Sequence, residues 1–482
     1  MHCPVVVLGG GPGGYAAAFL AADEGMEVTI VEVENRLGGT CLLRGCIPSK
    51  ALLHVAKVIG EVDELSHEWG VEYADKPKID VDKLRARKNQ VIQNLSGGLA
   101  NLAKRRGVKV IRARGSFLSS TSLKLDPVDD AEGSGIPEGG VLNFDYCIIA
   151  TGSVPAVPPA FDIGSDRVMD STGALAMKDI PGKLLVIGGG YIGLELGSVY
   201  ARLGSQVSVV ELLDGLLPGA DRDLVKPLAK QIDILCGGRV YLNTKVGSLA
   251  EVDDQVEVTF EGPGQFGHER FDRVLVSVGR RPVTHGLGLE NTQVVVNGRG
   301  FVVCDHQQRT ADPHILAIGD VAGDPMLAHK ATHEGRVAAE VIAGKSSVFD
   351  KVAIPAVVFT DPEIAWAGLT EEQAAREGRK VDVAVYPWAA SGRAQALGRT
   401  DGLTKWLVDP ETQRVVGCGI VGTGAGELIA EAVLAIEMGC EVHDITSSVH
   451  AHPTLGETLM NAGEVHFGTA TEIYKPKKRP SA

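Results

Sequence analysis

The sequence predicts an α/β protein built around two Rossmann-like dinucleotide-binding domains. One pattern occurs twice: a short apolar strand runs into a glycine triplet that opens a helix. In both copies a glutamate ends the next apolar run, at the same offset from the first glycine. A single glycine triplet is a weak signal, so the prediction rests on the repetition and on the matched acids.

The first copy starts almost at the N-terminus. Residues 5–8 are the expected strand, and Gly9, Gly11 and Gly14 form the triplet. Residues 28–31 are the next strand, which leads into Glu32. Such glycines permit a tight turn and bring the backbone close to a pyrophosphate at the helix N-terminus, while the acid accepts hydrogen bonds from a ribose. The plainer alternative for Glu32 is an exposed carboxylate at a strand end.

The second copy begins at residues 184–187 and continues into Gly188, Gly190 and Gly193. Its acid is Glu211, after a strand at residues 207–210. A ribose 2′-phosphate would be repelled by this carboxylate and would need an arginine nearby. Residues 212–214 contain none, which favours NAD over NADP.

Length and charge bound the function. A chain of 482 residues predicts about three domains, and a net charge of −14 argues against nucleic acid or an anionic membrane as partner. No apolar run reaches the length of a membrane span. The early first strand leaves no room for a leader peptide, so we expect a cytoplasmic protein. We expect no metal site at Cys41 and Cys46, because no second Cys or His pair stands at zinc-ligand spacing near them.

Cys41 and Cys46 are the most informative pair in the chain. On an ideal helix their Cα atoms would lie about 8 to 9 Å apart, beyond the limit of about 7 Å for a disulfide. We therefore expect the helix to distort, with Gly45 as the candidate position. Lys50 would share a helix face with Cys46 and lower its pKa. The alternative is two unrelated buried cysteines.

The segment 38–50 resembles the redox-active disulfide signature of the flavin-dependent pyridine nucleotide–disulfide oxidoreductases. This resemblance implies a Cys41–Cys46 disulfide, FAD in the first glycine fold and NAD in the second. It implies that Gly39 and Thr40 contact FAD, and that Lys50 and Glu195 form an ion pair near the reactive edge of the flavin. Without the resemblance, Lys50 and Glu195 would be taken as exposed helix residues.

Further segments resemble the same family in order along the chain. Residues 150–153 and 277–282 resemble the turns at the domain crossings, which implies that Thr151 and Gly152 bind FAD and that Gly279 binds NAD. Residues 315–320 resemble the second FAD motif, so Asp320 is expected to contact the ribitol chain. Asp is also a favoured helix N-cap, and Asp320 could serve as both.

The C-terminal segment 450–457 resembles the signature of the dihydrolipoyl dehydrogenase branch of this family, as do residues 359–363 and 386–393. The resemblance implies that His452 is a base oriented by Glu457, that dihydrolipoamide attacks Cys41, and that Cys46 then faces the flavin as a thiolate. FAD would carry the electrons to NAD, giving lipoamide and NADH. From spacing alone, residues 454–457 read as a capping box and His452 as a packed histidine.

The family architecture implies three domains. The FAD domain would comprise residues 1–153 and 281–345, the NAD domain residues 154–280, and the dimerisation domain residues 346–482. The active site would be shared between the two subunits of a homodimer. Expected partners are dihydrolipoamide or a lipoyl protein, and the acyltransferase core of a 2-oxo acid dehydrogenase complex or a glycine cleavage system. We expect residues 475–480 to be a frayed terminus.

One departure from the family pattern and three rival functions remain open. Leu43 and Arg44 differ from the common family pattern. Arg44 could stabilise a thiolate of the dithiol by its charge, but we expect it to point to solvent. A glutathione reductase would prefer NADPH, and a mercuric reductase would carry a Cys pair near its C-terminus, whereas the last cysteine here is Cys440. A flavin-binding scaffold without dithiol turnover is the alternative from another functional class.

Overall fold

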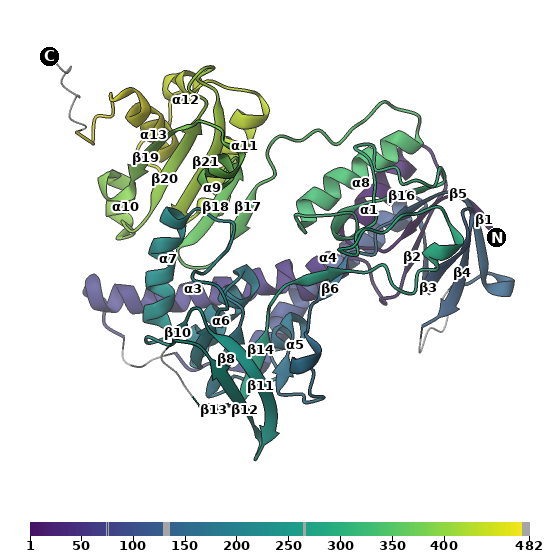
Figure 1. The fold of residues 1–482 in the computed structure, drawn as a ribbon, viewed down its shortest axis with the longest axis horizontal. Helices are drawn as coiled ribbons and strands as arrows, with labels where there is room; N and C mark the ends of the chain where they lie inside the picture. The colour runs from purple at the N-terminus through teal and green to yellow at the C-terminus, as the bar shows by residue number, and fades with distance from the viewer. Residues whose placement is uncertain (74, 76, 129–134, 264–266, 475–482) are drawn as a thin grey trace.

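The computed structural model describes residues 1–73, 75, 77–128, 135–263 and 267–474, which form three lobes (Figure 1). The predicted tail at 475–480 lies outside the described residues. The N-terminal lobe holds a six-stranded sheet of β1 (His2–Leu8), β2 (Val28–Glu32), β3 (Lys109–Ser119), β4 (Ser122–Pro127), β5 (Val141–Ile149) and β16 (Ile315–Ala317). Its helices are α1 (Pro12–Asp23), α2 (Gly39–Arg44), α3 (Cys46–Glu68), α4 (Val81–Arg105) and α8 (Ala328–Ile342), with 3-10 turns η1 (Glu138–Gly140), η3 (Leu289–Asn291) and η4 (Gly319–Val321).

The position of α1 brings the first glycine turn to the edge of this sheet. β1 pairs in parallel with both β2 and β5, so the carboxyl ends of these three strands lie side by side. α1 buries the small residues Gly13, Ala17, Ala18 and Ala21, which lets it pack closely. A Cβ on Gly335 of α8 would lie 2.5 Å from the carbonyl oxygen of Gly13, which shows how near α8 comes to α1.

The second lobe contains a five-stranded parallel sheet in the order β10 (Val240–Tyr241), β9 (Gln206–Val210), β8 (Lys183–Ile187), β14 (Arg273–Val276) and β7 (Val168–Met169). Its helices are α5 (Ser171–Ala176), α6 (Tyr191–Leu203) and α7 (Arg222–Leu235), with the turn η2 (Pro159–Phe161). β11 (Lys245–Val252), β12 (Gln255–Glu261) and β13 (His268–Phe271) form a separate antiparallel sheet. Both predicted strands of the second copy, β8 and β9, are confirmed.

The chain passes between these two lobes twice, at neighbouring places. β6 (Ser153–Pro155) leaves the first lobe and pairs antiparallel with β15 (Arg280–Pro282), which returns to it. Because β16 then joins β5, the first lobe is discontinuous in sequence. The two crossing strands therefore stand between the two glycine folds.

The third lobe is an antiparallel sheet in the order β17 (Ala356–Val358), β18 (Glu363–Gly368), β21 (Val415–Gly422), β20 (Leu403–Val408) and β19 (Asp382–Pro387). It also contains α9 (Glu371–Glu377), η5 (Trp388–Ala390), α10 (Gly392–Leu397), α11 (Ala425–Glu437), α12 (Val442–Ser447) and α13 (Glu457–Phe467). The core holds Trp388 and Trp406, whose indole N–H groups donate to the hydroxyl of Thr404 and the carbonyl of Leu459. Buried indoles are thus both packed and hydrogen-bonded.

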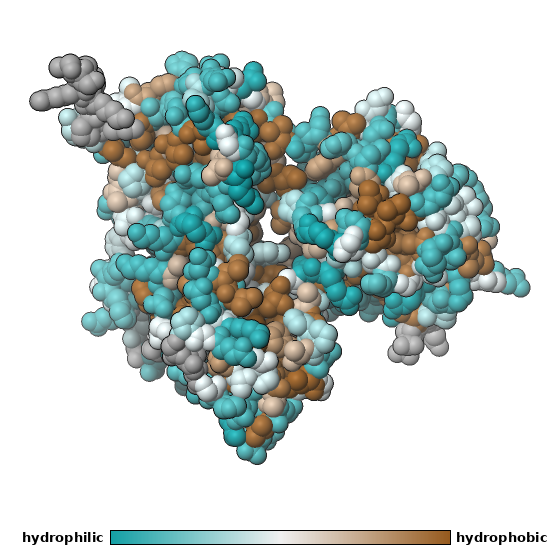
Figure 2. Space-filling view, in the orientation of Figure 1, coloured by the Kyte–Doolittle hydropathy of each residue, from teal (hydrophilic) through white to brown (hydrophobic). Residues whose placement is uncertain are grey.

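The surface view shows the three lobes meeting around a central hollow on the face drawn (Figure 2). Polar and apolar side chains are mixed over most of this face. Among the helices of the described residues, none combines the length and the apolar character needed to cross a bilayer.

Candidate active site

The helix carrying Cys41 and Cys46 is interrupted between them. α2 ends at Arg44, α3 begins at Cys46, and Gly45 has φ −143° and ψ −115°, outside the helical region. A Cβ on Gly45 would lie 2.8 Å from the carbonyl oxygen of Thr40, so the break needs a residue without a side chain. The predicted distortion is confirmed at the predicted residue. Both cysteines are free thiols here.

The two thiols differ strongly in acidity. A hydrogen bond from the Cys41 thiol and the nearby Lys50 ammonium lower the pKa of Cys46 to about 7. Donating that bond raises the pKa of Cys41, and burial adds to the rise. The geometry thus makes Cys46 the thiolate of the reduced pair near neutral pH.

Lys50 and Glu195 form an ion pair across two lobes. Nζ of Lys50, on α3, lies 2.8 Å from Oε2 of Glu195, on α6. The Glu195 side chain is only 4% exposed, whereas that of Lys50 is 32% exposed. The backbone N–H of Phe359 donates to the other oxygen of Glu195 at 2.9 Å. The alternative of two exposed, unrelated helix residues is therefore wrong for Glu195.

The glycines of the first dinucleotide-binding turn, which we call the first glycine fold, have two roles. Gly9 and Gly14 allow close backbone packing, and Gly11 leaves open space. Gly9 has φ +112°, and a Cβ there would lie 2.3 Å from the carbonyl oxygen of Ala150. A Cβ on Gly14 would lie 1.9 Å from the carbonyl oxygen of Gly9. Around Gly11, the N-cap of α1, the nearest atom to such a Cβ would be 3.8 Å away. This is the room that a pyrophosphate needs at a helix N-terminus, so the residues fit a dinucleotide.

The second glycine fold repeats this division. Gly188 has φ +107°, with a Cβ position 2.6 Å from the carbonyl oxygen of Ser277, and a Cβ on Gly193 would lie 2.3 Å from the carbonyl oxygen of Gly188. The space beside Gly190, the N-cap of α6, is open to at least 4 Å. Gly279 has φ +131° and the same open surroundings. This site, too, fits a dinucleotide.

Glu32 and Glu211 are both buried, at 7% and 9% exposure, and both accept backbone N–H groups. Burial raises the pKa of Glu32. The alternative of exposed strand-end carboxylates is wrong. Leu212 and Leu213, which follow Glu211, are exposed and carry no positive charge, so the surroundings fit a ribose hydroxyl better than a phosphate.

One cavity of about 420 Å³ gathers most of the predicted FAD and dithiol residues. It lies between the carboxyl ends of β1, β2 and β5 and the break between α2 and α3. The predicted residues that line it are Gly9, Gly11, Gly14, Glu32, Gly39, Thr40, Cys41, Cys46, Lys50, Thr151, Gly152, Glu195 and Asp320. Tyr191 and Ile192, at the start of α6, line it as well.

Sequence reasoning missed the polar network around Asp320. The Ser153 hydroxyl donates to the Asp320 carboxylate at 2.5 Å, and Arg280 donates from Nε to the Ser153 hydroxyl at 2.7 Å. Asp320 lies in η4, whose N-cap is Ile318, so the N-cap alternative is wrong. Ser153 and Arg280 belong to the two crossing strands. Their place directly beside the two crossing turns was the signal that could have identified them.

Arg44 is partly exposed, with 38% of its side chain accessible, but it has a partner that was not expected. Its guanidinium pairs with the carboxylate of Glu34, and both residues line the cavity. The loop after β2 carries Glu34 toward the end of α2, which offers Arg44 a partner that the local sequence does not reveal.

His452 and Glu457 form a pair that lies apart from this cavity. The two side chains join through Nδ1 and Oε1 at 2.9 Å, and the other Glu457 oxygen accepts the N–H of Thr454 at 2.7 Å. The predicted capping box is not formed, because Gly456 is the N-cap of α13 and the Thr454 hydroxyl donates to the carbonyl of Ala451; only the bond from the Thr454 N–H to Glu457 matches the pattern. His452 is 77% exposed, so the packed-histidine alternative is wrong. Neither His452 nor Glu457 is among the described residues that line the cavity of Cys41.

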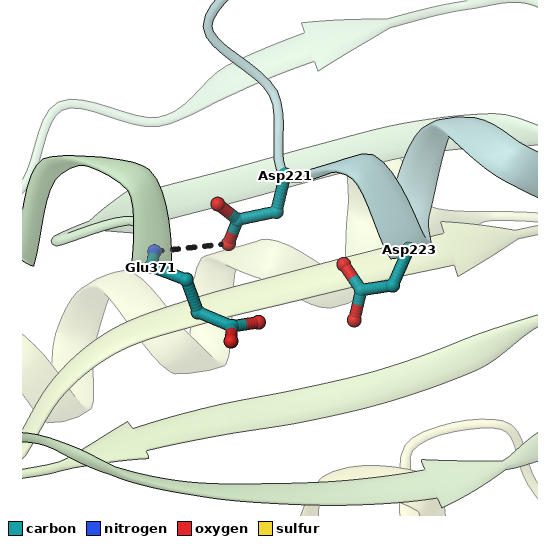
Figure 3. A group of neighbouring side chains, drawn as sticks. All are labelled: Asp221, Asp223 and Glu371. Carbon is teal, nitrogen blue, oxygen red and sulfur yellow. Dashed lines mark hydrogen bonds between the residues drawn. The ribbon is translucent and has the colours of Figure 1, made fainter. Parts of the chain in front are cut away.

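Three carboxylates converge between the second and third lobes: Asp221, Asp223 and Glu371 (Figure 3). The Glu371 N–H donates to Asp221 at 3.2 Å. The ammonium of Lys405, whose side chain is fully buried, lies 2.8, 2.7 and 2.5 Å from the three carboxylates respectively. An internal cation therefore already occupies the position that a metal ion would take.

Comparison with known proteins agrees with the geometry. Residues 3–335 match the pyridine nucleotide-disulphide oxidoreductase family model, and residues 354–462 match the dimerisation domain of the same family. The dihydrolipoyl dehydrogenase of Vibrio cholerae is 49% identical over 478 residues, covering 98% of each chain. That of Geobacillus stearothermophilus is 44% identical and covers 97% of each chain.

Among solved structures, a Cu(II) complex of the HOCl-induced flavoprotein disulfide reductase of Escherichia coli is 30% identical, with a TM-score of 0.82 over 94% of this chain and 98% of that one. LpdA from Mycobacterium tuberculosis superposes with a TM-score of 0.85 at 26% identity, over 96% and 99% of the two chains. The likeness thus extends through both dinucleotide folds and the third lobe. This chain belongs to the pyridine nucleotide-disulphide oxidoreductase family.

Proposed function

We propose that this chain is a dihydrolipoyl dehydrogenase, which oxidises dihydrolipoamide to lipoamide and reduces NAD to NADH. The observation that carries the proposal is the pair of Cys41 and Cys46 in the wall of a dinucleotide cavity, in a chain 41–49% identical to several dihydrolipoyl dehydrogenases over nearly its whole length.

FAD belongs in the first glycine fold. Gly9 and Gly14 shape the turn, Gly11 leaves room for the pyrophosphate, and Glu32 receives the ribose. Gly39, Thr40, Thr151, Gly152 and Asp320 line the same cavity toward the dithiol. When bound, FAD supplies a two-electron carrier between the dithiol and the nicotinamide.

NAD belongs in the second fold, on Gly188, Gly190 and Gly193, with Gly279 nearby and Glu211 at the ribose. The buried carboxylate and the two exposed leucines after it support NAD rather than NADP.

The dithiol chemistry follows from the unequal acidities. A thiolate of dihydrolipoamide attacks Sγ of Cys41 in the oxidised enzyme, the Cys41–Cys46 bond breaks, and Cys46 leaves as a thiolate. The Lys50 ammonium favours that leaving group, which agrees with the lowered pKa of Cys46. His452 takes the proton of the second substrate thiol, whose sulfur attacks its neighbour in the mixed disulfide. Lipoamide is released with Cys41 as the departing sulfur, and the enzyme holds the two electrons as its reduced pair.

Glu457 orients the base. Its carboxylate is bound to His452 at Nδ1, which leaves Nε2 free to accept the thiol proton and stabilises the imidazolium that forms. Because His452 lies apart from the chain's own cavity, we propose that the partner subunit of a homodimer supplies it to each dithiol. The match to a dimerisation domain supports this arrangement.

We propose the domain boundaries 1–153 with 281–345, 154–280 and 346–482. The division of the strands among separate sheets, and the crossing at β6 and β15, support them. We further propose a cytoplasmic location and an acyltransferase core as binding partner. The net charge of −14 suits a basic binding domain.

The test is to give the purified flavoprotein dihydrolipoamide with NAD or with NADP and to follow reduced nicotinamide. We expect turnover with NAD, at least tenfold slower turnover with NADP, and a collapse of the rate in His452→Gln. A flavin-loaded enzyme inactive with dihydrolipoamide but active with another disulfide substrate would contradict the proposal and favour a different reductase of the family. An active Cys41→Ser variant would refute the dithiol mechanism.

A further inference from the structure

Phe359 contacts both members of the Lys50–Glu195 ion pair. It follows β17 and therefore comes from the third lobe, whereas Lys50 is on α3 and Glu195 on α6. The Lys50 ammonium lies 4.4 Å from the centre of the Phe359 ring. The Phe359 N–H donates to Glu195 Oε1 at 2.9 Å, while Oε2 accepts from Lys50 at 2.8 Å. Three segments distant in sequence thus meet at one carboxylate.

The contacts have different consequences for the two charges. Glu195 is nearly fully buried, so losing either hydrogen-bond partner would leave one of its carboxylate oxygens buried without a donor. Lys50 has a flexible four-carbon stem and a partly exposed side chain, so the ion pair alone does not fix its position. A cation over an aromatic face is attracted to it, and the ring therefore restricts where the ammonium can lie.

The place to which Lys50 is restricted matters because of Cys46. Lys50 lies one helical turn beyond Cys46 on α3, and its charge is one of the causes that lower the pKa of that thiol. A displaced ammonium would act on the sulfur from farther away and through more water, which weakens the interaction.

Lys50 lies where two cavities meet, and Phe359 lines one of them. Lys50 lines the cavity of the dithiol, and Lys50 and Phe359 together line a second cavity of about 650 Å³ between α3, α6 and the third lobe. His54 and Lys57, on the next turns of α3, line that second cavity too. Removing the ring would widen this cavity beside the ion pair and admit water to it.

We propose that Phe359 is a positioning residue for the redox dithiol, holding Lys50 with its ring and Glu195 with its backbone N–H so that the ammonium stabilises the Cys46 thiolate. The inference deepens the proposed function, since it concerns the thiolate on which that function depends.

The test separates the ring from the backbone contact. Phe359→Leu keeps the N–H and removes the ring, and Phe359→Tyr keeps both. The readout is the pH midpoint at which the thiolate appears in anaerobic enzyme reduced by two electrons, followed by the long-wavelength absorbance of a thiolate beside oxidised flavin. We expect the midpoint of Phe359→Leu to rise by about 0.5 to 1 pH unit, and that of Phe359→Tyr to stay within about 0.2 unit.

Phe301→Leu is the matched control. The guanidinium of Arg299 lies over the Phe301 ring, 5.1 Å from its centre, and Phe301 does not line the dithiol cavity. Its midpoint should not move. Phe359→Met is a second ring-free variant, should Phe359→Leu bind flavin poorly, and flavin content and thermal midpoint are recorded for all variants.

A double variant decides whether the effect passes through Lys50. Lys50→Met should raise the midpoint by itself, and adding Phe359→Leu should then change it no further. An equal shift from Phe359→Leu with and without Lys50 would overturn the proposal, as would ring-free variants with normal flavin content and an unchanged midpoint. No dihydrolipoamide enters this measurement, so its result is separate from failure of the proposed function, which is read from substrate turnover.

Discussion

Glu32 and Glu211 make the same pair of backbone contacts in the two dinucleotide folds. Oε2 of Glu32 accepts the N–H of Gly10, and Oε2 of Glu211 accepts that of Gly189, both at 2.6 Å. The second oxygen of each acid accepts the N–H two residues further on, at 2.9 and 2.8 Å. Each carboxylate therefore joins its glycine turn to the end of the next strand, in addition to the ribose contact that we propose for it.

Glu211→Gln should weaken NAD binding with little effect on the dithiol chemistry. A neutral amide loses the charge-assisted hydrogen bonds of the carboxylate, so we expect KM for NAD to rise about tenfold while kcat changes less than about twofold. Steady-state kinetics with varied NAD measures this. Glu261→Gln, at an exposed ion pair of the same lobe, is the control. An unchanged KM would remove Glu211 from the NAD site.

Gly190→Ala should weaken NAD binding, whereas Gly193→Ala should destabilise the fold. Gly190 has φ −77° and open space around it, so alanine fits the fold but crowds the pyrophosphate, and KM for NAD should rise with the unfolding transition unchanged. At Gly193 the Cβ would meet the carbonyl oxygen of Gly188, which should lower the free energy of unfolding by about 1 to 3 kcal/mol. Denaturant unfolding and NAD kinetics on both variants check the pair. Equal stability losses would contradict the division into packing and binding glycines.

Glu457→Gln should lower kcat less than His452→Gln does, because it removes the orienting partner and leaves the base. We expect losses of about 10- to 100-fold and of about 10²- to 10⁴-fold, and the double variant should lose about as much as His452→Gln alone. Steady-state kcat of the three variants tests this. Multiplied losses in the double variant would show that the two residues act independently.

The pH dependence of the Glu457 contact can be stated with its sign. Burial of Glu457 opposes ionisation, but the hydrogen bonds from the Thr454 N–H and from His452 outweigh it and lower the pKa of Glu457. The contribution of the carboxylate is therefore complete above the ordinary carboxyl pKa and is lost only as pH falls through the lowered one. A pH–rate profile whose acidic limb near neutrality disappears in Glu457→Gln would contradict this.

Lys405→Met should strongly destabilise the contact between the second and third lobes. It leaves three converging carboxylates without their cation, and breaking a buried charge group in this way costs about 3 to 5 kcal/mol. Although burial opposes it, the hydrogen bonds to Asp221, Asp223 and Glu371 raise the pKa of Lys405, so this stabilisation is present below the ordinary lysine pKa and is lost only as pH rises through the raised one. Thermal unfolding measures the effect, with Lys245→Met at an exposed pair as control. Equal effects of the two variants would contradict the prediction.

Local sequence predicted the parts of the fold that depend on backbone conformation. The break at Gly45 followed from the reach of a disulfide compared with the rise of a helix, and the two glycine turns followed from their spacing. These features need only neighbouring residues, so the order of the sequence is enough to place them.

Contacts between segments distant in sequence could not be predicted from the local sequence. The pairing of Arg44 with Glu34 was missed, because the path of the loop after β2 brings Glu34 to it. Ser153 and Arg280 meet only because two crossing strands pair, and Phe359 reaches Lys50 from the third lobe. The His452–Glu457 pair was expected from a family resemblance, since its spacing alone indicates a capping box.

The separation of His452 from the cavity of its own chain has a genetic consequence. If each centre combines the dithiol of one subunit with the base of the other, a Cys41→Ser chain and a His452→Gln chain are each inactive alone but complement one another when co-expressed. Half of the dimers formed at random are then mixed, and each mixed dimer regains one intact centre of two. Such a gene would show interallelic complementation, with two recessive alleles together supporting growth that neither supports by itself.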